Sequence, residues 1–226
     1  MSILLLHGAL GSQRQLFKVK EALQEHSEVY SLDFSGHGDN RTELSFAIDQ
    51  FTSDVVHFLD ENGLDQVNIF GYSMGGYVAL NLAHHHEHRV NRIATYGTKF
   101  NWTPESAQKE VKMLNPEVIE QKVPKFAAHL ESTHGAKWKG VMRSTAQMMI
   151  DLGEAPNLTS EVLSSINHRV LITVGDEDTM VSIEESKRAA ASLSNSEFKI
   201  LEGFQHPIER VNAGFLATMT LGFFNA

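Results

Sequence analysis

The chain has 226 residues, enough for one α/β domain with a sizeable core and too few for two. Its net charge of −9 argues against nucleic acid as a partner, and no apolar run is long enough to span a bilayer, so we expect neither nucleic acid nor membrane contacts. The absence of Cys excludes disulfides and thiol chemistry, and the start at Met1 lacks signal-peptide features. We therefore expect a cytoplasmic protein.

Strands and helices alternate through the first half of the chain. Short apolar or β-rich runs predict four strands, at residues 3–6, 28–34, 67–70 and 90–96. Helical spacing of apolar residues predicts the intervening helices, at residues 17–26, 46–59 and 75–85. This alternation predicts βαβ units in a parallel sheet, where ligands bind beyond the carboxyl ends of the strands. The loops at Ala9, Gly36 and Ser73 all leave strands at that edge.

The alternation stops between residues 99 and 167. Thr103-Pro104 and Asn115-Pro116 each place a capping residue before a proline at the first helical position, which predicts two helix starts. Helical patterns also cover residues 126–131, 140–151 and 160–166. We interpret 99–167 as a helical lid inserted in a core made of residues 1–98 and 168–226. The alternative is a set of packing helices with no pocket beneath them.

The strand pattern returns at residues 169–174 and again at 197–201. Ser182 and Glu185 form a capping-box pattern, which predicts a helix between these two strands. A final helix is predicted to carry the apolar residues Ile208, Val211, Phe215 and Met219.

The segment around Ser73 predicts a nucleophile elbow. Gly71-Tyr72-Ser73-Met74-Gly75 is a G-x-S-x-G pattern, and it lies between an apolar strand and a helix of small residues. A Ser at the tip of such a strained turn needs flanking residues with almost no side chain, so that the two arms of the turn can approach each other. The alternative is a glycine-rich turn with a surface serine.

A serine hydroxyl needs a base within hydrogen-bond reach to act as a nucleophile. Of the twelve His, His206 directly follows the last predicted strand and so lies at the same sheet edge as Ser73. The base in turn needs an acidic partner that fixes its tautomer. Asp176, Glu177 and Asp178 share the loop after the preceding strand, and geometry cannot be used to choose among them from the sequence.

The oxyanion of an attacked carbonyl needs preorganised donors. We expect one from the backbone N–H of Met74, at the start of the helix after Ser73, and the second from the N–H of Ala9, after the first strand. His84 and His88 are four residues apart and could bind a metal ion, but nothing in the sequence supplies further ligands. We expect no metal and no cofactor.

Five segments of the chain resemble the α/β-hydrolase superfamily: LLLHGALGS at 4–12, DFSGHGDN at 33–40, GYSMGG at 71–76, VGDED at 174–178 and GFQHP at 203–207. The resemblance covers nearly the full length and implies an α/β fold with a mostly parallel sheet, helices on both faces and a helical lid. It places the triad on Ser73, Asp178 and His206 in the superfamily's order, and the oxyanion residue after His-Gly on Ala9.

Two departures from the superfamily pattern affect these expectations. Members usually carry two strands before the one that ends in His-Gly, whereas here that strand begins at residue 3. We therefore expect a shortened sheet of about six strands, whose exposed edge could support a dimer. The similar menaquinone-pathway lyases typically have Arg after the Gly-Gly pair, and this chain has Tyr77.

The resemblance implies a cofactor-free serine hydrolase that cleaves a carboxylic ester or thioester through an acyl-enzyme. Two alternatives use the same scaffold: a small-molecule receptor or regulator that binds its ligand under the lid, and a lyase or C–C bond hydrolase. Dehalogenases and epoxide hydrolases of this superfamily use an Asp nucleophile, and Ser73 argues against both.

Residues 99–150 carry eight Lys or Arg and five Glu, a balance of +3 within a chain of −9. This asymmetry either draws an anionic substrate toward the lid or reflects exposed lysines on amphipathic helices. The residues that could line an apolar pocket under the lid are Phe100, Trp102, Phe126, Trp138, Met142, Met148 and Met149. We expect most of them to be ordinary packing between the lid and the rest of the chain, since Met and aromatic residues commonly fill such gaps.

Overall fold

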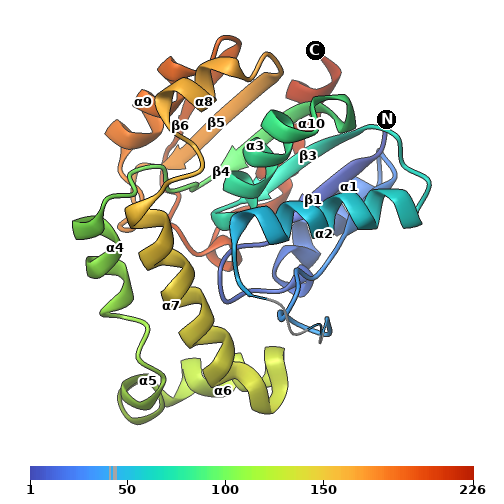
Figure 1. The fold of residues 1–226 in the computed structure, drawn as a ribbon. Helices are drawn as coiled ribbons and strands as arrows, with labels where there is room; N and C mark the ends of the chain where they lie inside the picture. Colours follow the sequence, from blue (N-terminus) through green and yellow to red (C-terminus); the bar gives the residue numbers. More distant parts are fainter. Residues whose placement is uncertain (41, 43–44) are drawn as a thin grey trace.

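The computed structural model describes residues 1–40, 42 and 45–226 and contains a six-stranded open sheet (Figure 1). The strands are β1 (Ile3–Leu6), β2 (Val29–Ser31), β3 (Val67–Tyr72), β4 (Val90–Tyr96), β5 (Arg169–Gly175) and β6 (Ser196–Leu201). Their order in space is β2-β1-β3-β4-β5-β6, and each neighbouring pair is parallel. The predicted sheet of about six strands is confirmed, with every strand parallel.

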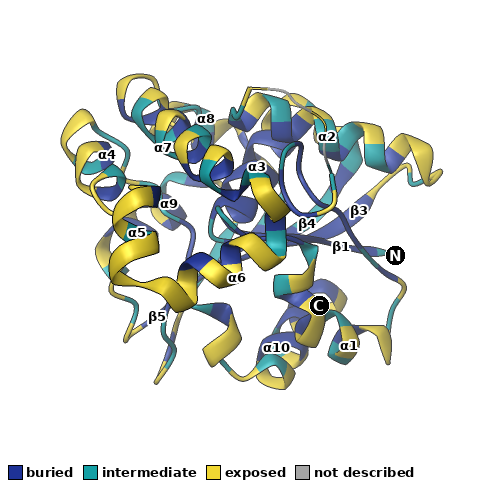
Figure 2. Ribbon diagram, turned by 90° about the horizontal axis from the view of Figure 1, so that it is seen from below, coloured by how far each residue is buried: buried dark blue, intermediate teal, exposed yellow. Residues whose placement is uncertain are grey.

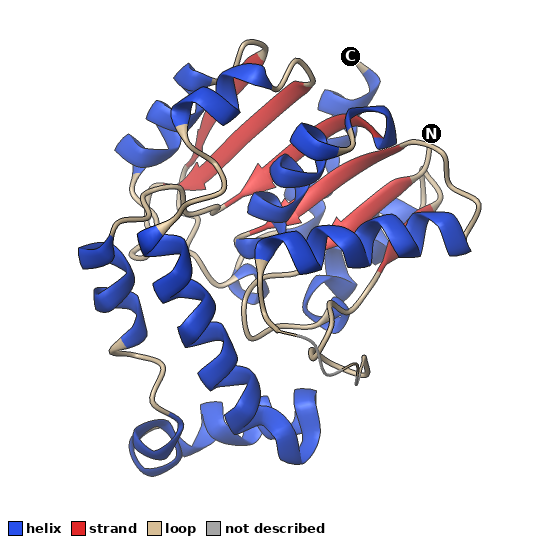
Figure 3. Ribbon diagram, in the orientation of Figure 1, coloured by secondary structure: helices blue, strands red, loops and turns tan. Residues whose placement is uncertain are grey.

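Helices cover both faces of this sheet (Figure 3). They are α1 (Phe17–Gln24), α2 (Ile48–Glu61), α3 (Met74–His85), α8 (Ser160–Ser165), α9 (Ile183–Ser192) and α10 (Ala213–Asn225). Successive strand residues point to opposite faces, so Leu4 and Leu6 pack in the core on the α2 and α3 side, while Ile3 and Leu5 pack in the core on the α1 and α10 side. Two apolar cores, one on each face, therefore hold the sheet between layers of helices.

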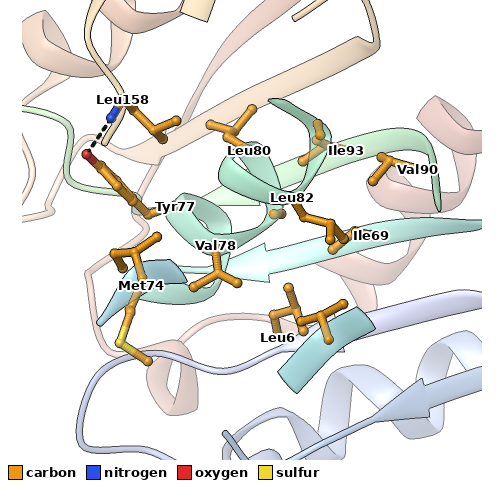
Figure 4. Packing of buried hydrophobic residues seen from close by; sticks show 14 of the residues in the cluster. Leu6, Ile69, Met74, Tyr77, Val78, Leu80, Leu82, Val90, Ile93 and Leu158 are labelled. Carbon is orange, nitrogen blue, oxygen red and sulfur yellow. Dashed lines mark hydrogen bonds between the residues drawn. The ribbon is translucent and has the colours of Figure 1, made fainter. Parts of the chain in front are cut away.

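Helix α3 runs through the centre of the larger core. Ten of its twelve residues are buried, and a helix that is apolar on all sides is one enclosed by the protein. Figure 4 shows Val78 and Leu82 of α3 packed among Leu6 and Ile69 of the sheet. The start of α3, which carries the Ser73 turn, is thereby fixed to β1 and β3.

Apart from α8, which packs beside α9, the helices between β4 and β5 extend beyond the carboxyl ends of the strands (Figures 1 and 3). They are α4 (Pro104–Val111), α5 (Pro116–Lys122), α6 (Pro124–His134) and α7 (Trp138–Glu154). The predicted starts of α4 and α5 are confirmed, because the Thr103 and Asn115 side chains accept hydrogen bonds from the N–H groups of Ser106 and Val118. Figure 2 shows that much of the surface of α4, α5 and α6 is exposed.

Two predicted elements differ from the structure. The final helix does not include Ile208 and Val211: a short 3₁₀ turn, Ile208–Arg210, comes first, and α10 starts after Asn212, whose side chain accepts a hydrogen bond from Phe215 N–H. Strand β2 ends at Ser31 rather than continuing to 34, and the chain turns at residues 35–39. Among the described residues, none of the helices combines the length and apolar character that a bilayer crossing requires.

Candidate active site

Ser73 lies at the turn between β3 and α3 with φ 51° and ψ −117°. Positive φ is costly for a residue with a Cβ, and it persists only where the surroundings enforce it. Here Ser73 N–H donates to the Tyr96 carbonyl at 2.8 Å, and Thr98 Oγ1 donates to the Ser73 carbonyl at 3.0 Å. The backbone N–H and C=O of Ser73 are thus both held by hydrogen bonds, one to β4 and one to the loop that follows β4.

The glycines around Ser73 allow the two arms of the turn to meet. A Cβ on Gly71 would lie 2.4 Å from Gly76 Cα, and one on Gly75 would lie 2.2 Å from the Leu6 carbonyl oxygen. Both distances are far below van der Waals contact, so only glycine fits at these positions. The turn has the strained geometry predicted from G-x-S-x-G, and the Ser73 side chain is partly exposed.

His206 and Asp178 are hydrogen-bonded to each other. His206 Nδ1 lies 2.8 Å from Asp178 Oδ2, and the Asp178 side chain is fully buried. The other carboxylate oxygen accepts hydrogen bonds from Met180 N–H and Val181 N–H at 2.8 and 2.9 Å. Because this carboxylate accepts from Nδ1–H, the imidazole is held as the tautomer whose Nε2 is free to accept a proton.

The two other acids of this loop do not contact His206. Asp176 accepts a hydrogen bond from Gly203 N–H, and Glu177 accepts one from the Gln205 side chain. Both are exposed. Of the three acids that the sequence left open, Asp178 is therefore the one that is hydrogen-bonded to His206.

Two tyrosines that the sequence analysis did not single out position the His206 loop. Tyr72 Oη donates to the His206 carbonyl at 3.1 Å, and Tyr96 Oη donates to the Gln205 carbonyl. Burial raises the pKa of both hydroxyls, so they remain protonated donors. Their positions at the ends of β3 and β4 indicated from the sequence only that they lie near the candidate site, because those strand ends meet the loops at the predicted edge.

Ser73 and His206 line one cavity of about 640 Å³, together with Ala9 and Met74. A Cβ on Gly8 would lie 3.3 Å from Ser73 Cβ, so the loop after β1 passes directly beside the serine. Neither Ala9 N–H nor Met74 N–H donates to another described residue. Among the described residues no hydrogen bond joins Ser73 Oγ to His206, and such bonds are often long before substrate binds.

Most of the cavity wall is apolar. Of the seven lid residues proposed from the sequence, Trp102, Phe126, Met148 and Met149 line it. The other three lie elsewhere: Trp138 and Met142 pack in a separate cluster, and Phe100 borders a smaller cavity of about 200 Å³. Five methionines contribute to the lining: Met74, Met113, Met148, Met149 and Met180.

The charged residues of the cavity wall balance one another. Lys99 Nζ lies 3.2 Å from Glu110 Oε1, with side chains only 17% and 11% exposed, and Glu209 and Arg210 also line the cavity. Two further basic lid residues are paired outside it, Lys139 with Glu120 and Arg143 with Glu117. The positive balance of the lid sequence therefore does not give this cavity a net positive wall.

Potential metal ligands do not gather in the part of the chain that the structure describes, where no group of three or more His, Asp or Glu is positioned to hold an ion. His84, one of the pair considered from the sequence, instead contacts Ser165: its Nδ1 lies 2.9 Å from the hydroxyl oxygen.

The family model described as alpha/beta hydrolase fold matches residues 2–208. The chain belongs to this family. Among curated proteins it is 30% identical over 80 residues to ethanol acetyltransferase 1 of Hanseniaspora uvarum and 38% identical over 82 residues to ethanol acetyltransferase 1 of Kluyveromyces marxianus. Each alignment covers 34% of this chain, and the chain spans only 24% and 22% of those relatives.

Solved structures of the same fold match nearly the whole chain. NosK from Streptomyces actuosus superposes with a TM-score of 0.83 at 19% identity, covering 99% of this chain and 97% of NosK. The enol-lactonase from Burkholderia xenovorans LB400 superposes with a TM-score of 0.79 at 20% identity, covering 100% of this chain and 91% of the lactonase. At such identities the likeness establishes the fold, and with the family match it supports an enzyme of the hydrolase type.

Proposed function

We propose that this chain is a serine hydrolase that cleaves a carboxylic ester or thioester through an acyl-enzyme. The observation that carries the proposal is a strained, partly exposed Ser73 in the same cavity wall as His206, whose Nδ1 is bonded to the buried Asp178 carboxylate. A serine that shares a cavity with an oriented imidazole is the arrangement that acyl transfer needs.

In the proposed first half-reaction, Ser73 Oγ attacks the carbonyl carbon while His206 Nε2 takes the hydroxyl proton. The carbonyl electrons move onto oxygen, and the N–H groups of Ala9 and Met74 stabilise the resulting oxyanion. The intermediate then collapses, the bond to the leaving oxygen or sulfur breaks, and His206 gives its proton to the leaving group. Asp178 stabilises the imidazolium between these steps.

In the second half-reaction, His206 takes a proton from water, whose oxygen attacks the acyl carbon on Ser73. Collapse of that intermediate releases the carboxylic acid and restores the Ser73 hydroxyl with the proton from His206. Each proton is returned within the cycle, so no cofactor or external acid is needed.

The size and lining of the cavity favour a substrate of modest size with an apolar portion. A volume of about 640 Å³ is typical of small-molecule sites. Tyr77, Trp102 and Leu152 line it beside the methionines, and the ion pair of Lys99 with Glu110 neutralises the charges nearest them. We therefore propose an uncharged apolar acyl or alcohol group inside the cavity.

A second candidate is acyl transfer to an alcohol. The relatives named ethanol acetyltransferase and probable alcohol acetyltransferase, at 30% to 39% identity over about a third of this chain, favour it. In this reaction an alcohol oxygen replaces water in the second half-reaction, His206 takes the alcohol proton, and an ester leaves in place of an acid. Product analysis with ethanol present separates transfer from hydrolysis, and it also reveals lyase or C–C chemistry.

The decisive experiment measures turnover of a panel of p-nitrophenyl esters and acyl thioesters by wild type and Ser73→Ala. We expect the variant to lose about 10⁴-fold or more in kcat while its circular dichroism spectrum is unchanged. Undiminished turnover in a folded Ser73→Ala would exclude the mechanism. Binding of a ligand without multiple turnovers by wild type would favour the receptor alternative.

A further inference from the structure

Ala9, the proposed oxyanion donor from the loop after β1, lies between two carbonyls that each contact a buried imidazole. The His7 ring donates from Nδ1 to the Gly8 carbonyl at 2.8 Å. The His134 ring donates from Nε2 to the Leu10 carbonyl at 3.0 Å. His7 directly follows β1, whereas His134 is the last residue of α6, more than a hundred residues away in sequence.

His134 can donate to Leu10 in only one neutral tautomer, and the structure selects that tautomer. Gly38 N–H donates to His134 Nδ1 at 3.0 Å, so Nδ1 carries no proton and Nε2 does. Burial lowers the pKa of His134, against a smaller raising effect of its hydrogen bond to the Leu10 carbonyl, so the ring is neutral at pH 7. Both ring nitrogens are therefore satisfied by backbone groups of two different core loops.

The hydrogen bond from His134 affects the orientation of Ala9 N–H through two peptide groups of the turn. In a trans peptide the C=O and the following N–H point in opposite directions. The Leu10–Gly11 peptide accepts from His134 at one side, and its Gly11 N–H donates to the Gly8 carbonyl at 3.1 Å on the other. The Gly8–Ala9 peptide is thereby oriented with its Ala9 N–H pointing away from Gly11. The N–H groups of His134, Gly11 and Ala9 therefore follow one another and point in the same direction.

Leu10 also needs this support, because its φ of 58° lies in the left-handed region that favours glycine. Its side chain packs against the cluster of Ala127, Leu130, Trp138 and Met142, which belongs to α6 and α7. Both the carbonyl and the side chain of the strained residue are thus held by the helices between β4 and β5, and not by the sheet.

We propose that His134 is a positioning residue for the oxyanion donor, acting through the Leu10–Gly11 and Gly8–Ala9 peptides. This inference rests on the proposed hydrolase function. His134 does not touch the substrate: it fixes the direction of Ala9 N–H, and a chain of aligned hydrogen bonds also polarises its last donor. The lid helix α6 therefore sets the geometry of the oxyanion site from outside the sheet.

A matched pair of variants separates the two bonds of His134. In His134→Gln the amide nitrogen reaches the place of Nε2 and can still donate to Leu10. In His134→Asn the amide oxygen takes the place of Nδ1 and keeps the Gly38 bond, but no donor reaches Leu10. Ser132→Ala, an exposed residue of the same helix, serves as the control. Thermal unfolding of each variant reports whether the fold is intact.

The expected result is a split between kcat and KM. His134→Asn should lower kcat about tenfold with KM within about twofold of wild type, since one lost neutral hydrogen bond corresponds to that factor. His134→Gln should recover kcat to within about threefold of wild type, and Ser132→Ala should match it. An alkyl boronate, whose tetrahedral adduct with serine places an oxygen in the oxyanion site, should bind His134→Asn about tenfold more weakly.

Wild-type kcat in a folded His134→Asn would overturn the inference. Equal losses of kcat in the Asn and Gln variants would also overturn it, because a general packing role predicts no difference between them. If wild type turns over no ester or thioester in the Ser73→Ala comparison, the proposed function fails first and this inference fails with it. The two failures are therefore distinguishable.

Discussion

Ser73 and Leu10 are the two non-glycine residues with positive φ in the described part of the chain, and they are held in different ways. Ser73 is fixed by the core, through the Tyr96 carbonyl, the Thr98 hydroxyl and the close approach of α3 to β1. Leu10 is fixed by α6 and α7, through His134 and an apolar cluster. Strain of this kind costs on the order of 1–3 kcal/mol at each residue. The comparison teaches that the candidate nucleophile is held by hydrogen bonds to β4 and the loop after it and by the packing of α3 on β1, whereas the proposed oxyanion loop depends on α6 and α7.

The largest effect on kcat among the residues held by the core is expected from a substitution at Asp178. Asp178→Asn should lower kcat about 10⁴-fold, because an amide can donate to His206 Nδ1 and favours the wrong imidazole tautomer. Steady-state kinetics with a p-nitrophenyl ester measures the loss, and Asp176→Asn, which leaves His206 untouched, is the control. A kcat within tenfold of wild type in Asp178→Asn would contradict the role of this carboxylate.

The elbow itself is expected to tolerate no side chain at Gly75. Gly75→Ala places a Cβ 2.2 Å from the Leu6 carbonyl, and the backbone shift should lower the free energy of unfolding by about 3 kcal/mol. Gly140→Ala is the matched control, since nothing lies within 4 Å of its Cβ and it is exposed on α7. That variant should be neutral or more stable by up to about 1 kcal/mol. Urea unfolding of both variants measures the difference, and equal midpoints would contradict the packing argument.

Acid should weaken the oxyanion loop rather than the elbow. Burial lowers the pKa of His7 to about 4, below the value of 6.5 for an unfolded chain, so the unfolded state binds more protons between these values. The free energy of unfolding should therefore fall by about 3 kcal/mol as pH drops from 7 to 4. The pKa values of His37 and His134 are lowered as well, again chiefly by burial, and act in the same direction.

Urea midpoints across this pH range test the prediction, and His7→Gln should flatten the dependence because the amide does not titrate. A stability that is constant or rises on acidification would show that His7 does not stay neutral in the folded state. The groups that hold Ser73, a carbonyl and a hydroxyl, do not titrate in this range, so the elbow supplies no comparable dependence.

The smallest effect is expected where the lid cluster contacts the loop. Leu10→Ala leaves the carbonyl bond to His134 but removes the side chain from the cluster around Leu130 and Trp138. A partly buried side chain of this size should contribute about 1 kcal/mol to the free energy of unfolding. Thermal unfolding measures this loss, and kcat should fall only about threefold. A tenfold or greater loss of kcat would show that the Leu10 side chain, rather than His134, mainly holds the loop in place.

Local patterns predicted the elements of the fold where the signal lies within one segment, and the same patterns indicated the candidate site residues. The Ser73 turn needs glycines beside it, and Asp178 and His206 lie in the loops that follow two strands, so residues close in sequence carry the information. The caps at Thr103 and Asn115 were found for the same reason. The hydrogen bonds of Tyr72, Tyr96 and His134 could not be assigned in this way, because their partners are distant in sequence; for the two tyrosines only their place at strand ends was visible.

The errors have similar causes. The apolar spacing of Ile208 and Val211 continues that of α10, but the Asn212 cap interrupts the helix between them and the rest. Trp138 and Met142 have the composition of a pocket lining, yet they lie in the first part of α7, which packs against α6, whereas Met148 and Met149 lie further along the helix and line the cavity.

The methionine-rich wall of the cavity makes the enzyme sensitive to oxidants. The chain has no Cys, so peroxide has no thiol to react with, and methionine thioethers are its main targets. Of the five methionines that line the cavity, Met113 and Met180 are the exposed ones, at 56% and 44%, and would be converted to sulfoxides before the other three. Each sulfoxide adds a polar S=O group to a wall suited to apolar acyl groups. Peroxide would therefore weaken substrate affinity while the Ser73 turn and its imidazole stay chemically intact, and methionine sulfoxide reductases would restore it.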